Sequence, residues 1–203
     1  MALLEAAARL YEGRGIEEVS LNAIAREANI SKGNVYRYFE SREELFLQLT
    51  LEAYQEWSED LIGRLNALGG AGDERAVAKV FATTIMAHPR YAKLSSVLST
   101  VLERNVSVEA VVRFKQAYFG ALEPLSNAVG AALPDLNADE LWQLVEASYF
   151  WIVSMWPAAH PAPAVREALQ RPELQQACID FQPRFEQQVL TMIRGLRAGH
   201  ERA

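Results

Sequence analysis

Cysteine is almost absent from this sequence, and its scarcity excludes an internal disulfide. The 203 residues include one cysteine, Cys178, and three widely separated histidines, His88, His160 and His200. A single thiol has no partner in its own chain, so a reducing compartment is the natural setting. The sequence also lacks metal-ligand spacings, phosphate-binding loops and nucleophile motifs. We therefore predict no catalytic residue, no metal and no cofactor, and expect that the protein is not an enzyme.

Long hydrophobic runs are lacking as well. The longest strongly apolar stretch, ASYFWIVSMWPAA from Ala147, is shorter than the roughly 20 residues that cross a bilayer. The N-terminal stretch MALLEAAARLYEGRG carries Glu5 and Arg9 among its apolar residues and has neither a basic lead nor a cleavage site, unlike a signal peptide. We expect no membrane contact and a cytoplasmic location.

Alternation of apolar and polar residues, the mark of a half-buried strand, is missing, whereas helical periodicity recurs along the chain. The fold class predicted is all-α. The expected helices are 1–13, 20–28, 32–38, 41–66, 73–88, 90–104, 107–132, 137–157, 162–171 and 173–197. Gly13, Gly15 and the GGAG at 69–72 are expected to end helices, and Asn137 with Glu140 to cap one.

Proline predicts two interruptions of this pattern. WPAAHPAPA at 156–164 contains three prolines and is expected to be a loop. Pro124 stands inside the seventh helix, where it removes a ladder bond, leaves the carbonyl of Gly120 unpaired and predicts a kink. Such a kink either wraps the helix around the core or shapes the wall of a cavity.

Residues 20–38 have the spacing of two helices joined by a short turn. Ser20 and Ser31 can each cap a helix with a hydroxyl oxygen. Asn29 stands in the turn, which requires a left-handed backbone conformation. Among non-glycine residues, Asn adopts this conformation most easily. Small and branched residues supply the apolar wedge between the helices: Ile24, Ala25, Ala28, Ile30 and Val35. This is the spacing of a helix-turn-helix.

The second helix of this pair carries side chains that cannot all be buried in so short an element. They are Lys32, Asn34, Tyr36, Arg37 and Tyr38, and Gly33 leaves room for a close approach. In a helix-turn-helix this recognition helix puts its N-terminal residues into the major groove of DNA. We predict that Phe39 is core, and a core position stays an alternative for Tyr36.

The segment VSLNAIAREANISKGNVYRYFESREELF resembles the N-terminal signature of the TetR family of bacterial transcriptional regulators. The matching positions are Gly15, Ile24, Ala25, Gly33, Tyr36, Phe39, Ser41, Glu43 and Leu45. The resemblance covers roughly the first quarter of the chain, and beyond it the helical layout and the length agree. Two departures are visible, since Asn29 replaces the usual glycine and the basic arm that often precedes the first helix is absent.

The resemblance implies contacts with double-stranded DNA. Phosphate contacts are implied for Ser20, Tyr36, Tyr38, where histidine is common in the family, and Arg42, where lysine is common. Base contacts are implied for Lys32, Gly33, Asn34 and Arg37. The net charge of −6, and the eight acidic against six basic residues in 1–50, oppose nonspecific binding. Between Arg26 and Arg42, however, four residues are basic and two are acidic. The charge of the surface that contacts DNA, rather than the net charge of the chain, sets the electrostatic contribution to binding.

The rest of the chain is expected to form a second domain. We divide the chain into a DNA-binding domain at 1–45 and an effector-binding and dimerisation domain at 46–203. A continuous helix over 41–66 is about 39 Å long at 1.5 Å per residue and connects the two. The resemblance implies a small-molecule effector within this second domain, and its aromatic content suits a mostly apolar pocket. The candidate pocket residues are His88, Phe114, Gln116, Tyr118, Gly120 and Tyr149.

The helix at 137–157 is apolar on two sides, and the last helix also carries apolar residues at helical spacing. The two together suggest a subunit interface, and the resemblance implies a four-helix homodimer contact. The candidate interface residues are Ser148, Ile152, Met155, Phe185, Val189, Met192 and Leu196.

The sequence thus predicts a dimeric DNA-binding transcriptional regulator. Repression is the family's commonest behaviour, so we expect a repressor that a small apolar or aromatic effector releases from a near-palindromic operator. The alternative is a DNA-binding protein that acts architecturally or through a protein partner, without an effector.

Overall fold

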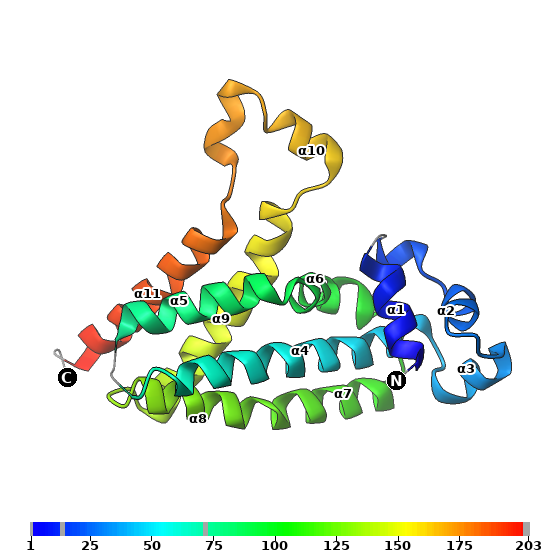
Figure 1. Ribbon diagram of the computed structural model, residues 1–203, viewed down its shortest axis with the longest axis horizontal. Helices are drawn as coiled ribbons and strands as arrows, with labels where there is room; N and C mark the ends of the chain where they lie inside the picture. Colours follow the sequence, from blue (N-terminus) through cyan, green and yellow to red (C-terminus); the bar gives the residue numbers. More distant parts are fainter. Residues whose placement is uncertain (1, 13–14, 71–72, 201–203) are drawn as a thin grey trace. The chain divides into compact units, whose positions relative to one another are not determined.

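The computed structural model describes residues 2–12, 15–70 and 73–200, and every regular element in these ranges is helical (Figure 1). The all-α prediction is confirmed. The elements are α1 (Ala2–Glu12), η1 (Ile16–Glu18), α2 (Leu21–Glu27), α3 (Lys32–Tyr38), α4 (Arg42–Asn66), α5 (Glu74–Ala87), α6 (Pro89–Val97), the π-helical η2 (Leu98–Leu102), α7 (Val108–Gly120), α8 (Leu122–Ala132), α9 (Ala138–Ala159), α10 (Pro163–Ala168), η3 (Pro172–Ala177) and α11 (Phe181–His200).

The chain forms two compact units. The first unit comprises Met1–Gln55 and Val97–Gly120, and the second comprises Glu56–Ser96 and Ala121–Ala203. Helix α4 therefore contributes its N-terminal half to the first unit and its C-terminal half to the second. Helix α7 belongs to the same unit as α1–α3, although it lies far from them in the sequence. The division of the chain at residues 45 and 46 remains a prediction.

The first unit has a core of small and aromatic side chains. Ala6 and Ala7 of α1 are fully buried, which lets neighbouring helices approach closely. Tyr11 of α1 meets Phe46 of α4 edge to face, with ring centroids 5.5 Å apart. Burial raises the pKa of Tyr11 to about 12. These contacts fix α1 against the N-terminal half of α4.

The second unit is centred on α11, which packs along α5 and α9. Their facing side chains have 0% exposure: Phe81, Ile85, Ile152, Phe185, Val189 and Ile193. Polar bonds hold α11 from outside this core, because Arg194 and Arg197 each bond Glu74, and Arg197 also bonds Asp135 at 2.7 and 2.9 Å. The core and its polar rim therefore leave α11 tightly attached within a single chain.

Several predicted helix ends are confirmed. Gly69 and Gly70 follow α4 with φ of +69° and +70°, in the left-handed region that glycine adopts without strain. Asn137 and Glu140 form a capping box at the start of α9. Gly13 lies outside the described residues.

Two proline predictions need correction. The single helix expected at 107–132 is wrong, because the chain breaks at Ala121 into α7 and α8. The interruption near Pro124 is confirmed, and Pro124 itself sits in the first turn of α8, where no N–H is needed. The loop expected from residue 156 is also wrong, since α9 continues through Pro157 to Ala159. There the His160 ring stacks on Trp156 with ring centroids 4.0 Å apart, and the His160 backbone N–H donates to the Trp156 carbonyl at 3.0 Å.

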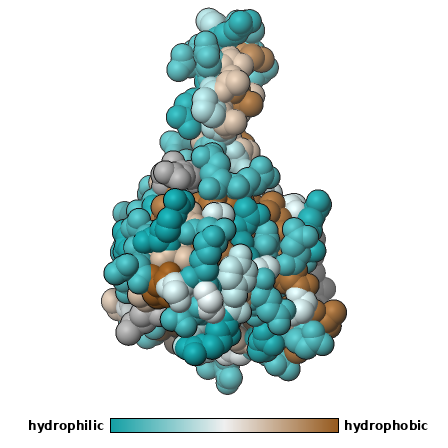
Figure 2. All heavy atoms as spheres, turned by 90° about the vertical axis from the view of Figure 1, so that its right-hand side faces the viewer, coloured by the Kyte–Doolittle hydropathy of each residue, from teal (hydrophilic) through white to brown (hydrophobic). Residues whose placement is uncertain are grey.

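Residues 161–180 project from the second unit between α9 and α11, and we call them the projection (Figure 1). None of its side chains is buried, and it shows apolar and hydrophilic residues side by side (Figure 2). Val165 is 51% and Leu174 39% exposed. The helix predicted at 173–197 is corrected accordingly, because 172–177 form a separate 3-10 helix and α11 begins at Phe181.

Within the described ranges, no helix combines the length and the apolarity that a bilayer crossing requires.

Candidate DNA-binding interface

Helices α2 and α3 are joined by a tight left-handed turn. Asn29 has a φ of 55°, so the conformation predicted for it is confirmed. The Ile30 N–H donates to the Ala25 carbonyl at 2.9 Å and the Ala28 N–H to the Ile24 carbonyl at 2.9 Å. These bonds satisfy the last carbonyls of α2. The chain can therefore reverse and enter α3 after only a few residues.

Both predicted caps and the predicted wedge are present. The Ala23 N–H donates to the Ser20 hydroxyl oxygen at 3.2 Å, and the Asn34 N–H donates to that of Ser31 at 3.4 Å. Ile24 and Val35 are 0% exposed, and Ala25 is 2% exposed. Ala28 and Ile30 are half-buried. The helix-turn-helix geometry is therefore confirmed from its own backbone and core.

The remaining side chains of α3 face solvent. The exposed residues are Lys32, Gly33, Asn34, Tyr36, Arg37 and Tyr38. Tyr36 is 53% and Tyr38 62% exposed, so the core alternative for Tyr36 is wrong. Phe39, predicted to be core, is half-buried. Two large aromatic side chains stand exposed on this polar face, which makes the surface a candidate binding site.

Gly33 has no role in the packing of the protein itself. A Cβ placed on it would meet no atom within 4 Å, and its φ is not in the left-handed region. A methyl group would therefore fit there, and alanine would favour the helix more than glycine does. The packing of the described residues does not require glycine at this position.

Arg37 and Tyr38 pair with each other on this surface. The Arg37 Nη2 donates to the Tyr38 hydroxyl oxygen at 2.9 Å, and the guanidinium carbon lies 5.0 Å from the centre of the Tyr38 ring. The pair holds a cation and an aromatic ring at the C-terminal end of α3. Both side chains keep unused donors for a phosphate oxygen.

Arg42, for which a phosphate contact is predicted, is bonded within the protein. Its Nη1 donates to the carbonyls of Ile16 and Val19 at 3.2 and 3.4 Å, and its Nη2 lies 2.6 Å from Glu43 Oε1. The side chain is only 25% exposed. Arg42 is thus turned inward and supports the backbone of η1, just before Ser20. Ser20 itself is exposed and caps α2.

Glu44 joins the turn after α3 to helix α7. Its Oε2 accepts the Glu40 N–H at 2.9 Å, and its Oε1 accepts Arg113 Nη2 at 2.8 Å. Sequence reasoning missed both Glu44 and Arg113, because 69 positions separate them and no local pattern links them. An acidic residue in the first turn of a helix is usually explained by the helix dipole alone.

The predicted effector residues are divided between the two units. Phe114 and Tyr118 lie together in the first unit, with ring centroids 5.7 Å apart, and Tyr118 also meets Tyr54 at 4.8 Å. On the same helix, Gln116 and Gly120 are exposed. In the second unit, His88 bonds Asp60 at 3.2 Å, and Tyr149 lies against its neighbour Phe150. Within the first unit, Tyr54, Phe114 and Tyr118 thus form an aromatic cluster, and the six-residue pocket remains a prediction.

A groove of about 370 Å³ runs along α7 within the first unit. Its lining residues are Tyr38, Phe39, Glu44, Leu47, Gln48, Leu51, Ala110, Arg113, Phe114 and Ala117. Leu47, Leu51 and Phe114 make an apolar floor, and the Glu44–Arg113 ion pair stands beside it. The groove therefore connects the end of the recognition helix with α7.

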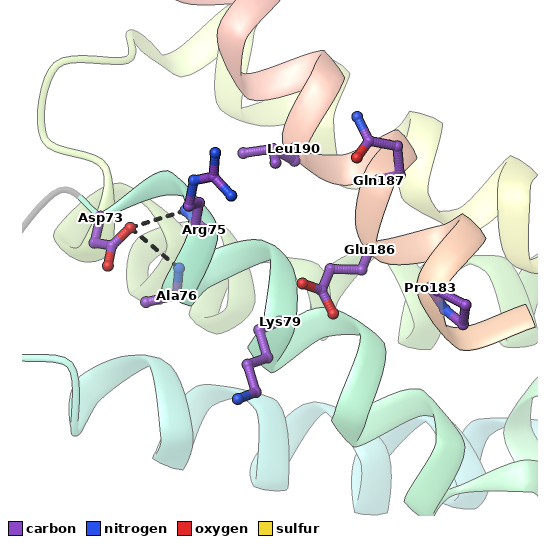
Figure 3. Close-up of a pocket in the computed structure, with 8 residues that line it drawn as sticks. All are labelled: Asp73, Arg75, Ala76, Lys79, Pro183, Glu186, Gln187 and Leu190. Atoms are coloured by element: carbon purple, nitrogen blue, oxygen red, sulfur yellow. Dashed lines mark hydrogen bonds between the residues drawn. The ribbon is translucent and has the colours of Figure 1, made fainter.

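A second groove, of about 580 Å³, lies between the N-terminal part of α5 and α11 (Figure 3). Both signs of charge line it, with Arg75 and Lys79 of α5 and Glu186 of α11. At one end of this groove, the Asp73 carboxylate accepts hydrogen bonds from the backbone N–H groups of Arg75 and Ala76 (Figure 3). This mixture does not match the mostly apolar pocket predicted for an effector.

The predicted dimer residues are largely internal. Ser148 is 1% exposed, and Ile152, Phe185 and Val189 are 0% exposed in a single chain, so they have no surface to offer a partner. Met155, Met192 and Leu196 are half-buried. The prediction is corrected for the four buried residues, which hold α9 against α11 of the same chain. The outward face of α9 instead carries Trp142, 44% exposed, and Phe150, 57% exposed.

The described residues contain no group of three or more His, Cys, Asp or Glu side chains that could hold a metal ion. An all-helical chain with an exposed recognition helix has the features of a helix-turn-helix DNA-binding protein. Two family models match it: "Bacterial regulatory proteins, tetR family" over residues 3–49, and "Tetracyclin repressor-like, C-terminal domain" over residues 51–200. The chain belongs to the TetR family of bacterial transcriptional regulators.

Solved structures agree with this fold. The chain is similar to the fatty acid degradation regulator FadR from Bacillus halodurans, with 14% identity, a TM-score of 0.54, and coverage of 93% of this chain and 96% of that chain. It is also similar to a TetR-family transcription regulator from Shewanella sp. PV-4, with 21% identity, a TM-score of 0.54, and coverage of 97% and 95%. A TetR-family regulator from Mesorhizobium loti shares 13% identity, with a TM-score of 0.53 and coverage of 97% and 94%. No curated protein sequence matches the chain.

Proposed function

We propose that this protein is a homodimeric repressor whose two α3 helices read the two halves of a near-palindromic operator. The observation that carries the proposal is the exposed face of α3, where Gly33 is free of any packing role and Tyr36 and Tyr38 stand open to solvent. Lys32, Gly33 and Asn34 occupy the N-terminal end, from which recognition helices reach base edges. Tyr36, Arg37 and Tyr38 lie further along, and Tyr36 and Tyr38 offer hydroxyls to phosphates.

Selection from random duplexes tests the proposal directly. Two symmetric recognition helices engage half-sites about one helical turn, ~34 Å, or a multiple apart, so the selected sequences share a two-fold motif. Affinity falls steeply with salt because the contacts release counterions. Lys32→Ala and Asn34→Ala alter the selected bases, whereas Tyr36→Phe weakens all sequences alike. Selected duplexes without two-fold symmetry would refute the dimeric reading of DNA.

We further propose that a small apolar or aromatic effector lowers the affinity for the operator. The aromatic cluster of Tyr54, Phe114 and Tyr118 and the apolar floor of the α7 groove support this chemistry. The likeness to FadR at 14% identity concerns the fold, so the effector class rests on the residues of this chain. An effector must bind one arrangement of the protein better than another, because equal affinity for both shifts nothing.

The matching measurement is the operator affinity with and without each compound that raises the melting temperature. A true effector raises the melting temperature and also changes the operator affinity. A screen in which every stabilising compound leaves operator affinity unchanged would favour the alternative, a DNA-binding protein that acts architecturally or through a protein partner.

A further inference from the structure

We infer that Arg113 of α7 is a positioning residue for DNA recognition, which it serves by holding Glu44 and, through Glu44, the turn that ends the recognition helix. The inference rests on the proposed reading of DNA by α3. It adds a residue from outside the helix-turn-helix to the machinery that sets its geometry.

The first step is the way Glu44 is bonded. Each carboxylate oxygen has a different partner, since Oε2 accepts the backbone N–H of Glu40 at 2.9 Å and Oε1 accepts Arg113 Nη2 at 2.8 Å. The Glu44 N–H in turn donates to the Ser41 hydroxyl oxygen at 3.1 Å. The Glu44 side chain is only 17% exposed. One carboxylate therefore ties α7 to the backbone that follows α3.

The second step is the position of Glu40. Helix α3 ends at Tyr38, and the Phe39 N–H closes it with a bond to the Val35 carbonyl at 3.0 Å. Glu40 is the next residue, and α4 begins two residues later at Arg42. Fixing the Glu40 backbone consequently fixes the C-terminal end of α3, where Arg37 and Tyr38 stand.

The third step is the attachment of α7 to the same unit. Ala110 and Phe114 are buried on the face that lines the α7 groove together with Tyr38 and Phe39. Tyr118 packs on Tyr54 of α4 at 4.8 Å between ring centroids. Arg113 thus extends from a helix that is held by its own apolar contacts, so its guanidinium can act as a fixed point for Glu44.

Arg113 has little to do with global stability. Its side chain is 64% exposed, and ion pairs at such sites are screened by solvent. A loose recognition helix must, however, be ordered when it binds DNA, and that ordering lowers affinity. Loss of the Arg113 bond should therefore weaken DNA binding without unfolding the protein.

The test compares five variants, one of them a double variant, on the selected operator over a range of salt concentrations. Arg113→Ala should weaken binding roughly 3- to 10-fold for all sequences, a change typical of coupling networks. Arg113→Lys should recover most of the affinity. Glu44→Gln keeps an acceptor for the Glu40 N–H and loses the charge that pairs with Arg113. The double variant that adds Arg113→Ala should therefore bind the operator little more weakly than Glu44→Gln alone. Lys115→Ala is the matched control, because Lys115 is a cation of the same helix that pairs with Glu103 instead.

A direct phosphate contact by Arg113 is the competing explanation, and the salt dependence separates the two. A lost phosphate contact lowers the slope of log affinity against log salt by about 1, whereas the inference expects an unchanged slope. A lower slope, an equal loss in the Glu44→Gln background, or an equal loss in Lys115→Ala overturns the inference. Wild-type affinity in Arg113→Ala also overturns it.

Hydrogen exchange of the Glu40 amide gives a readout that needs no DNA. Arg113→Ala should speed the exchange of this amide several-fold and leave the amides within α1 unchanged, because only the support of Glu44 is removed. Unchanged exchange at Glu40 overturns the inference. If wild-type protein selected no duplex, the proposed function would fail, while this measurement would still decide whether Arg113 supports Glu44 and the turn after α3.

Discussion

At the scale of the residue, a substitution of Gly33 should affect the stability of the fold and the affinity for DNA in opposite directions. A Cβ at Gly33 meets open space in the free protein. Gly33→Ala should therefore stabilise the fold by up to about 1 kcal/mol, because alanine favours the helix. The same methyl group should weaken operator binding by about 1–3 kcal/mol, since it stands where the backbone approaches the duplex.

Thermal unfolding and operator affinity measure the two effects separately. Gly63→Ala is the control, because Gly63 is also exposed in a helix with nothing within 4 Å of its Cβ position, and it lies outside the helix-turn-helix. It should stabilise the protein and leave DNA binding unchanged. Operator affinity unaffected by Gly33→Ala would mean that α3 does not approach DNA closely at this position.

Two carboxylates give the second unit a predictable response to acid. The Arg64 guanidinium beside Asp60, helped by His88, holds the pKa of that carboxyl below its ordinary value of 3.8. Arg194 and Arg197 likewise lower the pKa of Glu74 from 4.5. A lowered pKa in the folded state adds stability that is present above the ordinary value and is lost as the pH falls through the folded value.

The stability deficit of Asp60→Asn and Glu74→Gln should therefore be largest above about pH 5 and should shrink below about pH 4. Denaturant unfolding at several pH values measures it. Glu59→Gln, an exposed carboxylate on the same helix as Asp60, controls for the change in net charge. A deficit that stayed constant down to pH 3 would assign the effect to packing.

At the scale of the element, the projection is the weakest part of the second unit. Its residues 161–180 contain two six-residue helices and no buried side chain. Helices this short are not stable in water without packing. Trypsin should therefore cut the native protein first after Arg166, since Pro172 blocks cleavage after Arg171, and mass spectrometry of early fragments identifies the site. Earlier cleavage at Arg64, inside a continuous helix, would contradict this order of stability.

For the individual elements, helix caps and turns were predictable from the sequence, whereas the tertiary contacts of each helix were not. Asn29, Ser31 and the Asn137 cap act through neighbours within a few residues, so their roles could be inferred. Pro157 was misread because proline near the end of a helix is tolerated when the next turn is held by packing, here by Trp156 and His160. Periodicity shows that a helix has apolar faces, but it does not show which face another helix of the same chain will cover.

The candidate site shows the same limit. The exposed residues of α3 were predictable, because a short helix with so many polar and aromatic residues cannot bury them all. Arg42 could not be assigned from its position alone, since the carbonyls that it binds belong to residues at least 23 positions away. The Glu44–Arg113 bond spans 69 positions and had no signal in the sequence.

At the scale of the whole molecule, the proposed homodimer requires a surface through which two copies bind each other. Trp142 and Phe150 are exposed on α9, with the exposed Glu146 between them at helical spacing and the half-buried Tyr149 and Val153 beside them. Two exposed aromatic side chains on one helix make this surface a candidate for an interaction. We therefore propose this face, rather than the buried Ile152 and Val189, as the apolar part of the homodimer contact.

A homodimer contact through Phe150 and one through Ile152 predict different results in sedimentation and circular dichroism. Phe150→Glu should yield folded monomers with weak operator binding, because a charge on the shared face opposes association and a single α3 reads one half-site. Ile152→Glu should instead unfold the second unit, since its site has 0% exposure and a buried unpaired charge costs several kcal/mol. Val108→Glu, at a 73% exposed position of α7, is the control and should remain dimeric. A folded Phe150→Glu protein that sediments as a dimer would move the interface away from this face of α9.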